Sequence, residues 1–474
     1  MSFTGYTLIR HAVVGLCLAG FVFALSNLVP GEAQAVPAFS RKYDVSCNLC
    51  HTAGFPKLND FGNQFRDDGY RIGDKEDEPT NLHFAYWPVS IRTTVGYQYS
   101  SRNKLATGGG GEVGATTSSF GFRALDIQAF GTLSKRITFG VEFAPGLAQG
   151  AFNAGGGGVG DTDLEAAFIR FNDLFDNTLF NVKVGKYEMD LPFSPKRSPT
   201  INTGFVMYDY TAGSPFARVI GNPTNQPGYG NANDTVFGDS RVGLELFGWK
   251  DIELLGGVFR YALNAISTSD SNVDITGGGR NLGFYGHVTQ SFGGYGIVDG
   301  HRLGVFGMWS QAPTAANAAV GGGNQTGTGE QSESYSRVGV DFSTTAFSVV
   351  NVYGAYMIAN DSRGLFRGQD GVTMAQKARW NGGFVEVDYT ILDPLIASYR
   401  FDWVTNNFQG DASRAKSFGD VQAHTLGLRH YFLVNKRVEV VLFSEYSNTV
   451  TQKTGRFGDN QREHVWLTGV DFAF

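Results

Sequence analysis

The last ten residues, Val465-Trp466-Leu467-Thr468-Gly469-Val470-Asp471-Phe472-Ala473-Phe474, have the alternating pattern of one β-strand with two different faces. Successive side chains of a strand point to opposite sides. One side therefore carries Trp466, Thr468, Val470, Phe472 and Phe474, and the other carries Leu467, Gly469, Asp471 and Ala473. Such a strand fits either a soluble sandwich or a lipid-facing barrel, so the rest of the chain has to decide.

The same alternation recurs from Pro88 to the end of the chain. In 241–246, Val242 and Leu244 share an apolar face, whereas Arg241 and Glu245 lie on the opposite one. Four further strands place charged residues opposite apolar ones: Arg337 and Asp341 opposite Val338, Val340 and Phe342; Glu386 and Asp388 opposite Val385, Val387 and Tyr389; Arg400 and Asp402 opposite Tyr399, Phe401 and Trp403; Glu439 and Glu445 opposite Val438, Val440 and Leu442. A sandwich buries the apolar face, and a membrane barrel turns it to lipid.

The links between these strands favour the barrel. Tight links are expected near Ser134, Lys250-Asp251, Thr344-Thr345, Asp393-Pro394 and Asn435-Lys436. Long polar or glycine-rich links lie between them, at 101–118, 147–162, 189–237, 265–279, 312–332, 360–378, 408–419 and 450–460. This alternation is typical of outer-membrane barrels, in which short periplasmic turns alternate with longer extracellular loops. The longest link, 189–237, is expected to fold into the lumen.

We therefore predict an all-β fold, a transmembrane antiparallel β-barrel of about 16 strands over residues 88–474. Strands of roughly 9–11 residues or slightly more would span the bilayer. The terminal strand, which ends in Phe474, also resembles the closing strand of bacterial outer-membrane proteins. A closed sheet satisfies every strand edge, as lipid requires.

Composition agrees with this class. Glycine accounts for 64 of 474 residues, aromatic residues for 14% and charged residues for only 17%. The net charge of −6 gives no reason to expect nucleic acid as a partner.

The N-terminus has the pattern of a secretory signal peptide over 1–35. Arg10 supplies a positive charge, Ala12 to Leu28 is apolar, and Ala33-Gln34-Ala35 is a small-x-small cleavage site. The alternative is a transmembrane anchor, because the apolar run is long for a signal. Either way we expect the protein to leave the cytoplasm.

Cys47-Asn48-Leu49-Cys50-His51 has the C-x-x-C-H spacing at which c-type haem is attached. Both thiols would bind the porphyrin covalently, and His51 would coordinate iron as an axial ligand. Three alternatives fit less well. A zinc site needs four ligands, a redox C-x-x-C needs a βαβ unit, and a disulfide leaves His51 without a role.

Residues 36–87 would form a small α-helical haem segment, with one covalent haem c helping so short a piece to fold. Leu58, Phe61 and Phe65 recur at helical spacing and are expected to pack on the porphyrin or on the barrel wall. For the second axial ligand we consider His83, the next histidine in the chain. The alternative is that His83 lies at the surface and that a lumen residue or water is the sixth ligand.

The chain resembles the fused monohaem cytochrome c–porin family of iron-oxidising bacteria. The likeness rests on Ala38-Phe39-Ser40-Arg41, the motif around His51, the run Phe55-Pro56-Lys57-Leu58-Asn59-Asp60-Phe61-Gly62, and Gly69-Tyr70. The family often has a second histidine three residues after the haem-binding one, where this chain has Gly54.

This likeness implies an outer-membrane Fe(II):cytochrome c oxidoreductase. Extracellular Fe(II) would be the electron donor and a periplasmic cytochrome the acceptor, with the haem in the barrel lumen or at its periplasmic mouth. Two other functions stay open: a porin-like transporter with a structural or sensory haem, and outward electron export. Lumen carboxylates could attract hydrated Fe(II) or could instead pair with Arg241, Arg337 and Arg400; they are Glu245, Asp341, Glu386, Asp388 and Asp402.

Overall fold

The computed structural model describes residues 38–54, 56–72, 88–107, 111–144, 163–201, 204–210, 219–220, 237–268, 282–313, 332–362, 378–408, 419–434, 438–452 and 459–474. The predicted signal peptide, Phe55 and His83 lie outside these residues. Of the described residues, no helix is both long enough and apolar enough to cross a membrane.

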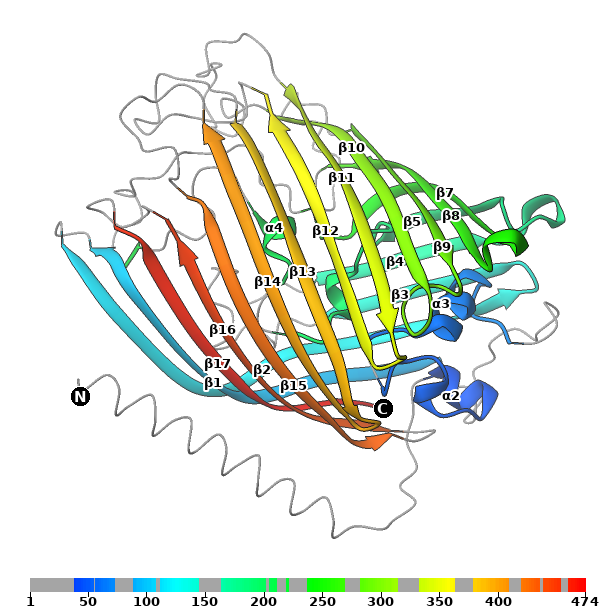
Figure 1. Cartoon of the computed structure of the whole chain (residues 1–474). Coiled ribbons are helices and arrows are strands. Elements are labelled where there is room, and N and C mark those ends of the chain that lie inside the picture. The colour runs from blue at the N-terminus through cyan, green and yellow to red at the C-terminus, as the bar shows by residue number, and fades with distance from the viewer. Residues whose placement is uncertain are drawn as a thin grey trace.

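One closed antiparallel sheet forms the body of the protein (Figure 1). Sixteen of its 17 strands make the barrel wall, and the two-residue strand β6 lies parallel to the end of β1. The strands are β1 Val89–Thr107, β2 Glu112–Ser134, β3 Ile137–Ala144, β4 Asp163–Phe171, β5 Asn181–Tyr187, β6 Val219–Ile220, β7 Arg241–Ile252, β8 Gly257–Ser267, β9 Leu282–Phe292, β10 His301–Pro313, β11 Ser332–Ala346, β12 Val350–Asp361, β13 Ala378–Leu392, β14 Leu395–Phe408, β15 Val421–Val434, β16 Glu439–Thr451 and β17 Gln461–Ala473.

The first and last strands close the sheet. β1 pairs with β17 in unbroken register from Arg92 opposite Ala473 to Arg102 opposite Glu463. Alternation along the strands is as predicted: Val338 and Val340 are 60% and 53% exposed on the outside, while Asp341 is buried inside. The structure thus confirms the predicted fold class, an outer-membrane-type barrel with an apolar outer face.

Two predicted tight links lie within a few residues of observed short turns. Lys250-Asp251 belongs to β7, and the turn follows at Glu253–Leu255; Thr344-Thr345 belongs to β11, which continues to Ala346. In both cases the polar side chains sit on strand ends near the membrane surface, where strands tolerate them. Two further short links, 172–180 and 293–300, were missed, and Asn435-Lys436 lies outside the described residues.

The predicted link 101–118 was also wrong, because most of it is strand. β1 has 19 residues and β2 has 23, well beyond the expected length. Ser101 pairs with Thr116 and Leu105 with Val113, so the polar stretch extends a hairpin above the membrane. Its polarity is explained by this position, since water rather than lipid meets those residues.

The lumen is packed, and the described part of the link 189–237 lies in it as expected, although the apolar character of this packing was not predicted. The segment 188–210, of which 202–203 lie outside the described residues, enters the barrel and carries the short helix α4 (Val206–Asp209). Phe205 stacks on Phe384 of β13 with ring centroids 4.1 Å apart, and Met207 is fully buried in the same apolar cluster as Met357. The inward-facing residues of β8–β15 near the long-loop end are therefore largely apolar. A polar, water-filled lumen had been expected there.

Buried ion pairs fix this inner segment to the wall. Arg400 of β14 contacts Asp402 at 2.8 Å and Glu386 at 3.3 Å, and its guanidinium donates to the carbonyl of Gly204 at 3.1 Å. Asp402 in turn accepts the backbone N–H of Val206 at 3.1 Å. One arginine thus neutralises two wall carboxylates and holds the inner segment.

Replacing Arg400 by glutamine should destabilise the barrel, because Glu386 and Asp402 would stay buried without their cation. Breaking a buried pair from one side costs about 3–5 kcal/mol. Urea unfolding of protein refolded in detergent micelles would measure the loss. Arg462→Gln, at an exposed position on β17, is the matched control. Equal midpoints for the two variants would contradict the role given to Arg400.

Candidate functional site: a plugged cavity

Residues 38–72 form a compact plug at the short-turn end of the barrel, where the C-terminus also lies (Figure 1). It contains helix α2 (Ala38–Tyr43), the single turn η1 (Cys47–Leu49) and helix α3 (Asp60–Asp67). Asn59 caps α3 by accepting the backbone N–H of Gly62 at 2.9 Å, and its amide donates to the carbonyl of Leu49 at 3.0 Å. One side chain therefore joins the start of α3 to the C-x-x-C-H turn.

Two glycines allow the plug to pack as it does. A Cβ on Gly62 would lie 2.0 Å from the carbonyl oxygen of Cys50, so only glycine lets α3 approach the cysteine turn this closely. A Cβ on Gly54 would lie 2.5 Å from the ring of Tyr431. The wall at β15 therefore leaves no room at position 54 for the histidine common in the resembled family.

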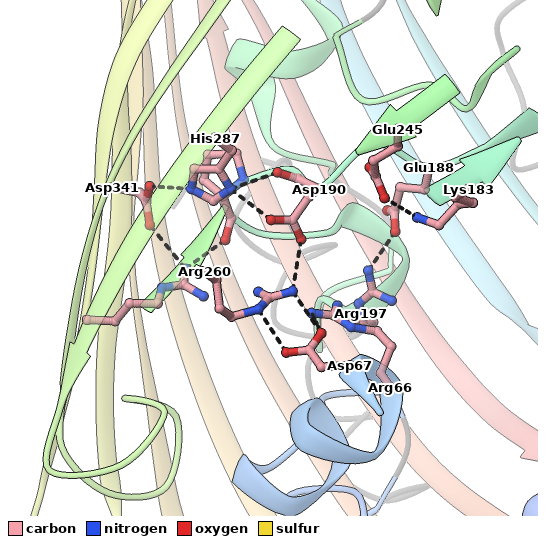
Figure 2. A network of polar contacts seen from close by, with 12 residues as sticks. Arg66, Asp67, Lys183, Glu188, Asp190, Arg197, Glu245, Arg260, His287 and Asp341 are labelled. Atoms are coloured by element: carbon pink, nitrogen blue, oxygen red, sulfur yellow. Dashed lines mark hydrogen bonds and ion pairs between the residues drawn. The ribbon is translucent and has the colours of Figure 1, made fainter. Parts of the chain in front are cut away.

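Charged side chains dock the plug on the wall (Figure 2). Asp67 at the end of α3 meets Arg260 of β8 at 2.8 Å, and Arg71 meets Asp173 at 2.9 Å. On the other side of the barrel, Lys57 pairs with Asp388 of β13 at 2.5 Å. The plug is thus tied to strands or turns around much of the barrel circumference.

A cavity of about 450 Å³ lies between the plug and the wall. Cofactor sites typically enclose roughly 300–1,000 Å³. Three residues of the predicted motif, Cys47, Cys50 and His51, line it, as do Leu58 and Phe65.

Phe61 does not line the cavity. It is 36% exposed, and Leu58 precedes α3 rather than lying on it. Leu58, Phe61 and Phe65 were predicted to share one helical face. The residues of α3 that line the cavity are instead Gly62, Phe65 and Arg66. The helix begins at Asp60, and this start sets which residues of α3 face inward.

Burial shapes the chemistry of the motif. Removal from water raises the pKa of the Cys47 thiol to about 12 and that of Cys50 to about 11. It lowers the pKa of His51 to about 4, so the imidazole is neutral, the form that binds metal. The two cysteines are not joined in a disulfide.

The cavity wall contains polar atoms that suit an anionic group. Arg170 of β4 donates to the carbonyl of Arg66 at 2.6 Å, yet its Nε has no hydrogen-bond partner. The hydroxyl of Tyr187, 1% exposed, also has none. The Arg66 guanidinium lies 3.6 Å from Asp67, which already binds Arg260. A porphyrin with two carboxylates fits a cavity that has apolar walls and spare donors.

The lumen carboxylates that were considered as iron ligands are all paired. Glu245 meets Lys183 at 2.5 Å and Asp341 meets Arg302 at 3.1 Å, while Asp388, Glu386 and Asp402 are paired as described above. Among the described residues, no group of three or more histidine, cysteine, aspartate or glutamate side chains is placed to hold a metal ion. A salt-paired interior therefore fits these five residues, but of the three predicted arginines only Arg400 pairs with them in the part of the chain that the structure describes. Arg241 lies 3.6 Å from Asp239, and Arg337 lies 2.9 Å from Asp361.

Sequence reasoning missed several cavity residues, among them Tyr187, Met189, Arg66 and Arg170. Arg170 and Tyr187 occupy inward positions of strands β4 and β5, which the alternation pattern alone could have identified. Met189 follows β5 in an irregular segment, where no periodicity indicates which way a side chain points.

Replacing Asp67 by asparagine should loosen the plug, because Arg260 would lose its buried carboxylate partner. Such a loss costs about 3–5 kcal/mol, so the population of molecules with an undocked plug should rise by at least about tenfold. Limited trypsin digestion followed by mass spectrometry should then show faster cleavage at Lys57 and Arg66. Asp44→Asn, at an exposed position of the plug, is the control. Cleavage at the same rate in both variants would refute this docking role.

No family model matches the chain, and no curated protein matches it in sequence. Among solved structures it is similar to the outer membrane channel DcaP of Acinetobacter baumannii, with 10% identity and a TM-score of 0.48 over 81% of this chain and 97% of that one. It is also similar to the anion-selective porin from Comamonas acidovorans, with 14% identity and a TM-score of 0.48 over 81% and 99%. It is also similar to OprB of Pseudomonas putida, with 11% identity and a TM-score of 0.41 over 88% of this chain and 98% of that one. With TM-scores below 0.5, these likenesses carry no argument, and the function has to be argued from the residues of this chain.

Proposed function

We propose that this protein is an outer-membrane c-type cytochrome–porin fusion that oxidises extracellular Fe(II) and passes the electron through one haem to a periplasmic cytochrome. One observation carries the proposal: a C-x-x-C-H motif lines a cavity inside a membrane barrel whose lumen is packed. Such an arrangement suits the transfer of electrons across the wall better than the transfer of solutes.

In this proposal Cys47 and Cys50 would hold the porphyrin covalently, and His51 would coordinate its iron. When bound, the haem would accept one electron at a time and pass it on. Leu58 and Phe65 present apolar surface to it and exclude water, while Arg66 and Arg170 provide cations for its carboxylates. Each Fe(II) gives up one electron and leaves as Fe(III), and the same electron reaches the periplasmic cytochrome.

The position of the plug supports this route. An electron tunnels efficiently over short distances only, so a lone haem has to sit within the barrel to approach both sides. The plug is docked at the short-turn end, which is periplasmic in outer-membrane barrels. A soluble cytochrome would therefore reach the plug from the periplasm, and Fe(III) would stay outside the cell.

The purified holoprotein should be reduced by Fe(II) in a stopped-flow experiment and reoxidised by an added soluble cytochrome c. The double variant Cys47→Ser, Cys50→Ser should lose the covalent chromophore, which peroxidase staining of a denaturing gel would detect. Barrel assembly of this variant is checked by its heat-dependent mobility on the gel. A holoprotein that Fe(II) does not reduce would leave outward electron export or a structural haem as the better account.

A planar-bilayer recording separates electron transfer from solute transport. Because the inner segment and the plug fill the described lumen, the wild-type protein should show no steady ohmic conductance. A general porin in the same bilayer serves as the positive control. Stable single-channel steps with the haem in place would instead favour the porin-like transporter.

A further inference from the structure

The cavity has a second wall that the sequence analysis did not assign. The inner segment leaves β5 at Glu188, and its next residue, Met189, is 1% exposed and lines the same cavity as His51. His51 belongs to the plug and Met189 to the inner segment. The cavity is therefore enclosed between two pieces of chain that are far apart in sequence.

Ionic contacts hold these two pieces on either side of Arg260 (Figure 2). The Arg260 guanidinium meets Asp67 of the plug at 2.8 Å and Asp190 of the inner segment at 3.5 Å. Asp190 also contacts His287 at 3.2 Å.

The residue on the other side of Met189 is fixed as well. Glu188 contacts Arg197 at 2.6 Å. Both neighbours of Met189 are therefore anchored, which fixes the position of this residue between the cavity and the buried apolar cluster of the inner segment.

Three other potential iron ligands of the cavity have partners of their own. Lys183 pairs with Glu245 at 2.5 Å, and Lys196 lies 3.0 Å from Glu142. The hydroxyl of Tyr43 donates to a backbone carbonyl at 2.9 Å. Among the described residues that line the cavity, His51 is the only histidine and Met189 the only methionine.

Tyr187, which also lines the cavity, is a competitor, because its hydroxyl has no hydrogen-bond partner. A tyrosine binds iron as the phenolate, and burying that anion in a largely apolar cavity costs free energy. A thioether is neutral and needs no deprotonation. The chemistry of the cavity thus favours sulfur over the phenolate.

We infer that Met189 is the second axial ligand of the haem, so that the inner segment completes the iron site that the plug begins. This inference rests on the proposed function, since it requires a haem at Cys47 and Cys50. Methionine–histidine ligation raises the reduction potential. The reduction potential of the haem would therefore lie well above that of a haem with two histidine ligands.

Met189→Leu removes the sulfur and nearly preserves side-chain volume, so packing changes little. The ferric wild-type protein should show the weak long-wavelength absorption band that sulfur ligation gives. The variant should lose that band, its midpoint potential should fall, and exogenous imidazole should bind its iron more tightly. Met308→Leu, at a buried wall position outside the cavity, should keep the band and the wild-type potential. Tyr187→Phe should also keep both.

The outcomes separate the two claims. A wild-type protein with covalent haem but no sulfur band, or a Met189→Leu variant with an unchanged spectrum and potential, would overturn the inference and leave the proposed function standing. A changed spectrum and midpoint potential in Tyr187→Phe, with neither changed in Met189→Leu, would assign the ligand to tyrosine. Absence of covalent haem from the wild-type protein would end the proposed function itself.

Discussion

Lipid offers no hydrogen-bond partner to a backbone amide, so everything in this protein depends on the pairing of β1 with β17. That ladder closes the sheet and removes its two free edges. Closure also fixes the direction of every side chain, because alternate residues must face either lipid or the lumen. The charged side chains that face the lumen then need partners of opposite charge inside the barrel. Arg400 with Glu386 and Asp402, and Arg260 with Asp67 and Asp190, meet that requirement.

The interior is more than a lining for a water-filled pore. The plug enters from the short-turn end and the inner segment from β5, and each is tied to wall residues by buried charges. Between them they leave one cavity that contains Cys47, Cys50 and His51. A passage for solutes would have to displace packed rings such as Phe205 and Phe384, whereas an electron needs only a redox centre at a suitable depth.

Local patterns predicted much of this from the sequence. Alternation in 241–246 and 337–342 placed Arg241, Glu245, Arg337 and Asp341 inward, where the structure buries them. The C-x-x-C-H spacing is visible in the sequence whatever the fold, and the structure places Cys47, Cys50 and His51 at one cavity; the haem stays a prediction. The alternation that places Glu386 inward also puts Phe384 on that face, and the link 189–237 was expected to enter the lumen; which of its residues pack on this ring could not be predicted, because the link has no periodicity. Likewise, Phe61 could be placed only once the start of α3 at Asp60 was known.

The most direct test of the account is electron transfer across a sealed bilayer. The holoprotein would be reconstituted into liposomes that contain oxidised soluble cytochrome c, and Fe(II) would be added outside with an iron(II) chelator trapped within. The account predicts that the trapped cytochrome is reduced while the chelator stays uncoloured. Colouring of the chelator before reduction, or no reduction in vesicles shown to contain holoprotein, would contradict it.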